Sequence, residues 1–129
     1  MAVMNHPTRL LLVEDEETAL AALRKFFTAT GADVDCACEL EEAEALIATT
    51  DYDVVIADLR LSWSHAEGLE ILRFVRRNSR HTHVIILSAH SSPDIRDSAD
   101  ALGADAFIAK PTPLAMIAET VSRVLGRPL

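Results

Sequence analysis

The sequence predicts a doubly wound α/β domain, in which a five-stranded, mostly parallel sheet carries five helices on its two faces. Two observations predict this fold class. Short apolar runs alternate along the chain with longer segments whose apolar residues recur at helical spacing. The runs are apolar almost throughout, which is typical of strands buried on both faces of a parallel sheet. Helical connections between consecutive strands favour right-handed crossovers and therefore parallel pairing.

The first strand is expected at Arg9–Val13, where the apolar run RLLLV begins the pattern. A helix is expected over Glu16–Thr30, because its apolar residues share one face, and Gly31 is a suitable residue to end it. These apolar residues are Ala19, Leu20, Leu23, Phe26 and Phe27. The weakly alternating segment Ala32–Cys38 is expected to form the second strand.

A short helix is expected at Glu41–Thr49, followed by the strand DVVIA at Asp53–Ala57. Leu69–Asn78 has apolar residues at helical spacing and a basic outer side, so it is expected to form the third helix. The continuous apolar run HVIILS at His83–Ser88 is expected to be the fourth strand.

The last two helices are predicted from a cap followed by proline. Ser92 is expected to cap a helix with Pro93 at its first position, and this helix is expected to end near Gly103. Thr112 followed by Pro113 has the same pattern of a cap residue and a proline, and this pair is expected to begin the last helix. The fifth strand, DAFIA, lies between them.

The domain organisation is expected to be one domain over residues 1–129, with a core from about 9 to 125. No internal repeat, low-complexity segment or linker is evident before Gly126, and the closing GRPL suits either a tail or the start of a linker. The first 15 residues contain only a short apolar run, so neither a signal peptide nor a membrane span is predicted, and a cytoplasmic location is expected.

The formal net charge is −8, which argues against binding of nucleic acid or of an anionic membrane through the overall field of the domain. Two acidic clusters contribute, and the first is the consecutive run Glu14, Asp15, Glu16 and Glu17. The second group is interpreted as a solvated helix start; it consists of Glu39, Glu41, Glu42 and Glu44. Cys36 and Cys38 stand two apart, and in one strand they would point the same way, which disfavours a mutual disulfide. They are expected to be small buried apolar residues.

The polar residues that end the strands are the candidate site. Glu14 and Asp15 follow the first strand, Asp58 ends the third, Ser88 ends the fourth and Lys110 follows the fifth. In an open parallel sheet, ligands collect outside the carboxyl ends of the strands, so these side chains are expected to share one rim. Clustered carboxylates suit a hard cation such as Mg²⁺, and an ammonium and a hydroxyl suit phosphoryl oxygens.

Each of these residues alone has an ordinary explanation. The two acids at 14 and 15 alone would be interpreted as a helix start favoured by the helix dipole, Lys110 as a surface lysine and Ser88 as a turn residue. Their joint placement at four strand ends favours a site instead. Because a carboxylate can accept a phosphoryl group as a mixed anhydride, Asp58 is interpreted as a nucleophile.

The segments LLVEDEE, DVVIADLRL, VIILSAH and DAFIAKP, in this order, resemble the receiver domain of bacterial two-component response regulators. The resemblance extends from about Arg9 to Leu125. It implies a flavodoxin-like sheet with strand order 2-1-3-4-5 between five helices. It also implies a signalling domain that assists its own phosphorylation and dephosphorylation without separate substrate turnover.

The same resemblance implies a role for each site residue. Asp58 is expected to be the phosphoacceptor. Asp15 and Asp58 are expected to bind Mg²⁺ directly, together with the backbone carbonyl of Arg60, and Glu14 through water. Lys110 is expected to pair with the phosphoryl group.

Ser88 resembles the switch hydroxyl and Phe107 the switch aromatic of the family, where tyrosine is common. The bond between Lys110 and Pro111 is expected to be cis. The expected phosphoryl donor is a sensor histidine kinase or phosphotransfer protein. The output partner, which is unknown, would meet the face made by the fourth helix, fifth strand and fifth helix. A homodimer is left open, and direct binding of nucleic acid or membrane is not expected.

The chain departs from the family pattern after the phosphoacceptor. Ser62 stands where proline is usual, and Gly68 follows ten residues after Asp58 rather than eight. The intervening loop therefore holds two extra residues and includes Trp63 and His65. A tolerated surface insertion is the favoured interpretation; a partner contact or a lid is the alternative.

Arg60 and His90 lie two residues past Asp58 and Ser88, where the family tunes hydrolysis of its acyl phosphate. Bulky cationic groups there are expected to block the attacking water.

Three other functions are alternatives to a phosphorylated receiver domain. A haloacid dehalogenase type phosphatase would need a second Asp two residues after the nucleophile, where Arg60 stands. A flavin binder would need a hydroxyl-rich loop after the first strand, where acids stand instead. A degenerate receiver that acts as a constitutive interaction module is the closest alternative.

Overall fold

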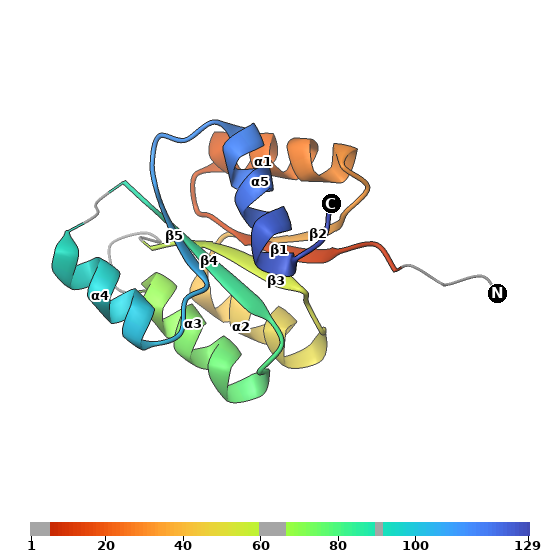
Figure 1. Cartoon of the computed structure of the whole chain (residues 1–129). Coiled ribbons are helices and arrows are strands. Elements are labelled where there is room, and N and C mark those ends of the chain that lie inside the picture. The colour runs from red at the N-terminus through yellow and green to blue at the C-terminus, as the bar shows by residue number, and fades with distance from the viewer. Residues whose placement is uncertain (1–5, 60–66, 90–91) are drawn as a thin grey trace.

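The structure is a computed structural model that describes residues 6–59, 67–89 and 92–129 (Figure 1). Strands and helices alternate along it. The strands are β1 (Arg9–Val13), β2 (Asp33–Ala37), β3 (Val54–Asp58), β4 (His83–Ser88) and β5 (Ala106–Ala109). The helices are α1 (Glu17–Ala29), α2 (Leu40–Thr49), α3 (Glu67–Asn78), α4 (Pro93–Ala101) and α5 (Leu114–Leu125).

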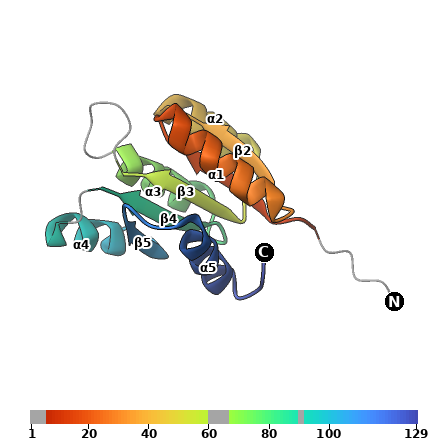
Figure 2. The same ribbon diagram turned by 90° about the horizontal axis from the view of Figure 1, so that it is seen from above.

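The five strands form one parallel sheet in the order β2-β1-β3-β4-β5. Helices α1 and α5 cover one face, and α2, α3 and α4 cover the other (Figure 1). Figure 2 shows that β2 and β5 are at opposite edges of the sheet. The predicted fold class and strand order are therefore confirmed.

The apolar strands supply two cores, one on each face of the sheet. Along β1 and β3, residues alternate between the cores: Leu11 and Val55 pack under α2 and α3, whereas Leu10 and Val54 pack under α1 and α5. All four are fully buried. Burial on both faces explains why these strands are apolar throughout. No helix in the described ranges is long and apolar enough to cross a membrane.

The two predicted helix caps have different outcomes. At α4 the Ser92 hydroxyl accepts a hydrogen bond from the Ile95 N–H, and Pro93 begins the helix, as predicted. At α5 the prediction is wrong: Pro113 takes the cap position, and no side chain caps the helix. The Thr112 hydroxyl donates instead to the carbonyl of Ala109, so it is committed to the end of β5.

The predicted burial of the two cysteines is wrong for Cys38 and holds only in part for Cys36, which packs against the core under α1 and α5. Cys36 is half-buried and Cys38 is exposed, and both are free thiols. Strand β2 ends at Ala37 and lies at the edge of the sheet, so little covers the residue that follows. The backbone N–H of Cys38 donates to the carboxylate of Glu42 in the first turn of α2.

The chain after α5 returns to the starting ends of the strands. Gly126 adopts the left-handed conformation at the end of α5, with φ of 73°, and turns the chain. The Arg127 guanidinium then donates to the Thr8 hydroxyl at 2.8 Å. It also lies 3.8 Å from the carboxylate of Asp53, which directly precedes β3.

Candidate functional site

The parallel sheet places the candidate residues on neighbouring strands. Glu14 follows β1, Asp58 ends β3 and Ser88 ends β4, and these three strands are adjacent. The register pairs Asp58 with Leu87 on β4 and Ser88 with Ala109 on β5. Lys110 comes directly after β5, and its N–H donates to the carbonyl of Ser88 at 2.7 Å. The carboxyl ends of four strands thus form one rim.

Lys110 joins two acids across this rim. Its Nζ lies 2.6 Å from Oδ2 of Asp58 and 3.1 Å from Oε2 of Glu14. The bond between Lys110 and Pro111 is cis, as the resemblance implied. The structure therefore brings together three of the predicted site residues from β1, β3 and the end of β5.

The electrostatics follow from this burial. Glu14 is 3% exposed, and burial, followed by the neighbouring Asp58, raises its pKa to about 7 from an ordinary 4.5. Burial alone would lower the pKa of Lys110, but its hydrogen bonds to the two carboxylates outweigh this effect and raise it. Lys110 is therefore held as an ammonium beside an acid that gains a proton readily.

Asp15 and Glu16 belong to the loop between β1 and α1. Asp15 is exposed, unlike its buried neighbour Glu14. Glu16 caps α1: its carboxylate accepts from the N–H groups of Thr18 and Ala19, which lowers its pKa. The first acidic cluster is therefore divided between a helix cap and the rim.

The carboxylate oxygens at the rim are the type of ligand that a hard divalent cation prefers. Among the described residues, no three acidic, imidazole or thiol side chains are arranged as a metal site. Mg²⁺ does not need such a group, since it is commonly held by one or two carboxylates and retains several waters. Glu14 and Asp58 share one ammonium, and Asp15 adds a third acid on the adjoining loop, so the rim has more acids than Lys110 neutralises.

Ser88 and Phe107 lie on the β4–β5 side of the rim. Ser88 is 1% exposed. Phe107 on β5 is half-buried and packs against the core under α2, α3 and α4. The guanidinium carbon of Arg96 in α4 lies 5.2 Å from the centroid of the Phe107 ring. Arg96 was not singled out from the sequence, because nothing local links a helical arginine to an aromatic residue on a later strand.

Gly68, known from the sequence only as the displaced glycine of the family pattern, makes a close backbone contact with the end of β3. Its N–H donates to the carbonyl of Leu59 at 3.0 Å. A Cβ atom at this position would lie 2.6 Å from Cα of Leu59 and 2.8 Å from the carbonyl oxygen of Asp58. The first turn of α3 therefore approaches the end of β3 more closely than any side chain allows. The predicted helix begins at Leu69, so Gly68 is expected just before it, whereas α3 begins at Glu67 and includes the glycine in its first turn.

Several predicted residues lie outside the described part of the chain. They are Arg60, Ser62, Trp63, His65 and His90.

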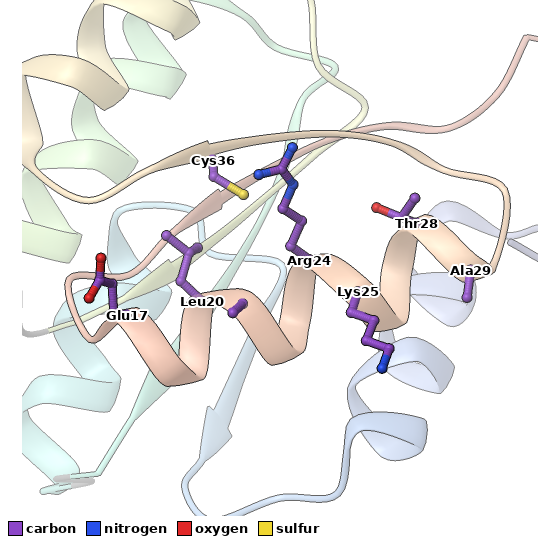
Figure 3. Close-up of a pocket in the computed structure, with 8 residues that line it drawn as sticks. Glu17, Leu20, Arg24, Lys25, Thr28, Ala29 and Cys36 are labelled. Atoms are coloured by element: carbon purple, nitrogen blue, oxygen red, sulfur yellow. The ribbon is translucent and has the colours of Figure 1, made fainter.

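Two hollows of the described surface lie away from the acids of the rim. One, of about 640 Å³, lies along α1 beside β2 and is lined by Leu20, Arg24, Lys25 and Cys36, among others (Figure 3). Another, of about 310 Å³, lies between α1 and the start of α5 and is lined partly by Lys110. Glu14, Asp58 and Ser88 line neither of these two hollows.

Comparisons with known proteins agree with this geometry. The family described as the response regulator receiver domain matches residues 10–122. The transcriptional regulatory protein PmrA of Pectobacterium parmentieri is 35% identical over 119 residues, which cover 92% of this chain and 53% of PmrA. The chain spans about half, or less, of the length of the curated relatives it matches.

Two solved structures are similar in fold. The receiver domain of HemR from Leptospira biflexa, in its non-phosphorylated form, superposes with a TM-score of 0.84 at 29% identity, covering 95% of this chain and 98% of that one. A CheY-like receiver domain protein from Methanospirillum hungatei superposes with a TM-score of 0.88 at 23% identity, covering 94% of this chain and 95% of the other.

Proposed function

Because this chain belongs to the response regulator receiver domain family, we propose that it is a phosphoacceptor switch, in which Asp58 takes a phosphoryl group from a phosphohistidine of a partner kinase or phosphotransfer protein. The contact that supports this most directly is the 2.6 Å hydrogen bond from Lys110 to Asp58 at the carboxyl end of β3. Receiver domains are signalling domains, and no separate substrate turnover is proposed.

Asp58 is the nucleophile. A carboxylate oxygen attacks the phosphorus, the new P–O bond forms, the P–N bond to the histidine breaks, and its electron pair leaves on the imidazole. The residue is buried but stands at the mouth of the strand, where a donor can reach it. This position explains why an apolar strand ends in an acid.

Lys110 binds the phosphoryl group after transfer. Its ammonium already contacts an oxygen of Asp58, so the same charge lies next to the oxygens that the phosphoryl group brings. The hydrogen bond from the Lys110 N–H to the Ser88 carbonyl fixes the backbone from which this side chain extends.

Asp15, Asp58 and the backbone carbonyl of Arg60 would hold Mg²⁺, with Glu14 acting through water. When bound, the cation offsets the charge of the acids and of the incoming phosphoryl oxygens. Glu14 is suited to the outer role, because its side chain is more deeply buried than those of Asp58 and the exposed Asp15.

Ser88 and Phe107 convert phosphorylation into a change of surface. The Ser88 hydroxyl turns to donate to the phosphoryl group, and Phe107 moves into the space that this leaves. The population thereby shifts towards a second arrangement of the face made by α4, β5 and α5. An output partner or domain would bind this face. The tuning of hydrolysis by Arg60 and His90 stays a prediction.

The test is phosphorylation with a small donor. The full chain is incubated with Mg²⁺ and acetyl phosphate, and its intact mass is measured. Wild type should gain one phosphoryl group, as should Asp51→Asn, in which an exposed acid just before β3 is changed; Asp58→Asn should gain none. A wild-type mass that does not change would favour the constitutive interaction module.

The metal ligands are tested without turnover. Mg²⁺ should raise the melting temperature of wild type and of Asp51→Asn, and it should have little effect on Asp15→Asn. An equal rise in Asp15→Asn would contradict the assignment of this residue as a ligand.

A further inference from the structure

Arg96 and Phe107 make a contact between α4 and β5, on the face that the proposed switch would alter. The guanidinium carbon lies 5.2 Å from the centroid of the ring, which is within the range of a cation–π interaction. Arg96 is exposed and Phe107 is half-buried, so the ring lies at the boundary between the core and the surface.

The sheet register places Phe107 on the same face as Ser88. Phe107 pairs with Ile86, and Ala109 pairs with Ser88. Because side chains alternate along strands, Ile86 and Ser88 point to one face, and Phe107, beside Ile86, points there too. Ser88 is buried and Arg96 is exposed, so a ring that moves inward towards Ser88 moves away from the guanidinium.

We propose that Arg96 is a positioning residue that holds Phe107 in its outer position. By doing so it lowers the apparent affinity of the domain for the phosphoryl group or its mimic. The inference rests on the proposed function of the Asp58 site. A tyrosine at this position could keep its outer position by hydrogen bonds from its hydroxyl, but phenylalanine has none. The Arg96 guanidinium over the ring supplies a polar contact instead of the hydrogen bond that a tyrosine hydroxyl would make. This cation–π contact is made only while the Phe107 ring is in its outer position.

The size of the effect follows from the exposure of the arginine. A cation–π contact at an exposed site should change the equilibrium between the outer and inner positions of the ring by about two- to five-fold. Loss of the guanidinium should therefore favour the inner position by this factor. Lysine keeps the charge but lacks the planar group, so it should retain part of the effect.

The test measures the apparent affinity for beryllofluoride, a stable mimic of the phosphoryl group, by ¹⁹F NMR in the presence of Mg²⁺. Arg96→Gln should bind it about two- to five-fold more tightly than wild type, with Arg96→Lys between them. Arg77→Gln, which removes the same charge from an exposed position on α3, is the matched control and should bind like wild type.

A double-mutant cycle separates the contact from a general effect on α4. In a Phe107→Leu background, Arg96→Gln should no longer change the affinity, because the ring is absent. An equal effect in both backgrounds, or no effect in wild type, would overturn the proposal.

Ring NMR separates this proposal from the function on which it rests. If wild type fails to bind beryllofluoride, the phosphoacceptor function fails, but the position of the ring can still be measured. Without any activator, nuclear Overhauser contacts between the Phe107 ring and the Ser88 methylene should strengthen in Arg96→Gln relative to wild type and Arg77→Gln. Unchanged contacts would refute the role of Arg96.

Discussion

The Lys110 ammonium lies 2.6 Å from an oxygen of Asp58, although 52 residues separate the two in the sequence. The same ammonium lies 3.1 Å from Glu14, so one cation holds two buried acids at the rim of the sheet. Under the proposed function, a phosphoryl group or a metal ion would therefore enter a site in which the Lys110 ammonium already offsets part of the negative charge of the acids.

Replacing Lys110 by Met should destabilise the metal-free protein, because the carboxylates of Glu14 and Asp58 lose their shared cation. Lys110 is partly exposed, so the free energy of unfolding should fall by about 1–3 kcal/mol, less than for a fully buried pair. Urea unfolding in EDTA measures this, with Lys25→Met on the exposed side of α1 as the control. Added Mg²⁺ should reduce the loss; an equal loss with and without Mg²⁺ would contradict this account.

The raised pKa of Glu14 predicts how stability depends on pH in the metal-free protein. The folded state holds a proton on this acid up to about pH 7, whereas the unfolded chain releases it near 4.5. Between these values the folded state binds more protons, so this contribution to the free energy of unfolding should fall as the pH rises. It should be complete below 4.5 and lost above about 7.

Urea unfolding in EDTA at a series of pH values from about 4 to 8 tests this, with Glu14→Gln as the comparison, because its side chain does not titrate. The free energy of unfolding of wild type should fall more steeply with pH than that of the variant. Parallel curves would show that Glu14 does not titrate in this range.

Gly68→Ala should damage both stability and phosphorylation. The new Cβ would meet the backbone of Leu59 and Asp58 at distances that real contacts do not show, so α3 or the end of β3 must shift. We expect a loss of about 2–4 kcal/mol in the free energy of unfolding and slower phosphorylation by acetyl phosphate. Gly31→Ala is the control: its φ of 93° makes it strained, but no atom lies within 4 Å of the added Cβ. A phosphorylation rate equal to that of Gly31→Ala would refute the link to Asp58.

Arg76 should contribute more to stability than the adjacent arginine of α3. Its guanidinium donates to the carbonyls of Thr82 and Gly103 and to the carboxylate of Asp105, joining α3 to the starts of β4 and β5. Arg76→Lys cannot reproduce this planar set of donors and should cost about 1–3 kcal/mol. Arg77→Lys, at an exposed position, should change stability by less than about 0.5 kcal/mol. Similar midpoints for the two variants in urea unfolding would contradict this.

The fold could be predicted because its signals are local. Continuous apolar runs such as Val54–Ala57 indicate strands buried on two faces, and the cap and proline at Ser92 and Pro93 marked the start of α4. The same two signals at Thr112 failed, because its hydroxyl bonds to the preceding strand and not to the helix. A local pattern cannot show which of two partners a hydroxyl will choose.

The candidate site was predictable to the extent that it depends on strand ends. Glu14, Asp58 and Lys110 meet because parallel strands bring their carboxyl ends to one edge. The contacts of Arg76 and of Arg96 depend on how helices pack against later strands, which no spacing in the sequence records. The exposure of Cys38 was missed for a similar reason, since it depends on β2 being at the edge of the sheet.

After α5 the chain turns back at Gly126, and Arg127 then contacts the starting ends of the strands. This has a practical consequence for binding experiments in which the protein is attached to a sensor chip. Arg127 contacts Thr8 and Asp53, which precede β1 and β3, so this part of the chain lies at the opposite end of β3 from Asp58, roughly 16 Å away along the strand. A dye or biotin coupled beyond Leu129 would thus be remote from the acidic rim. A sensor chip that captured the protein through such a tether would present Asp58 to the solution and leave it open to a kinase flowing past.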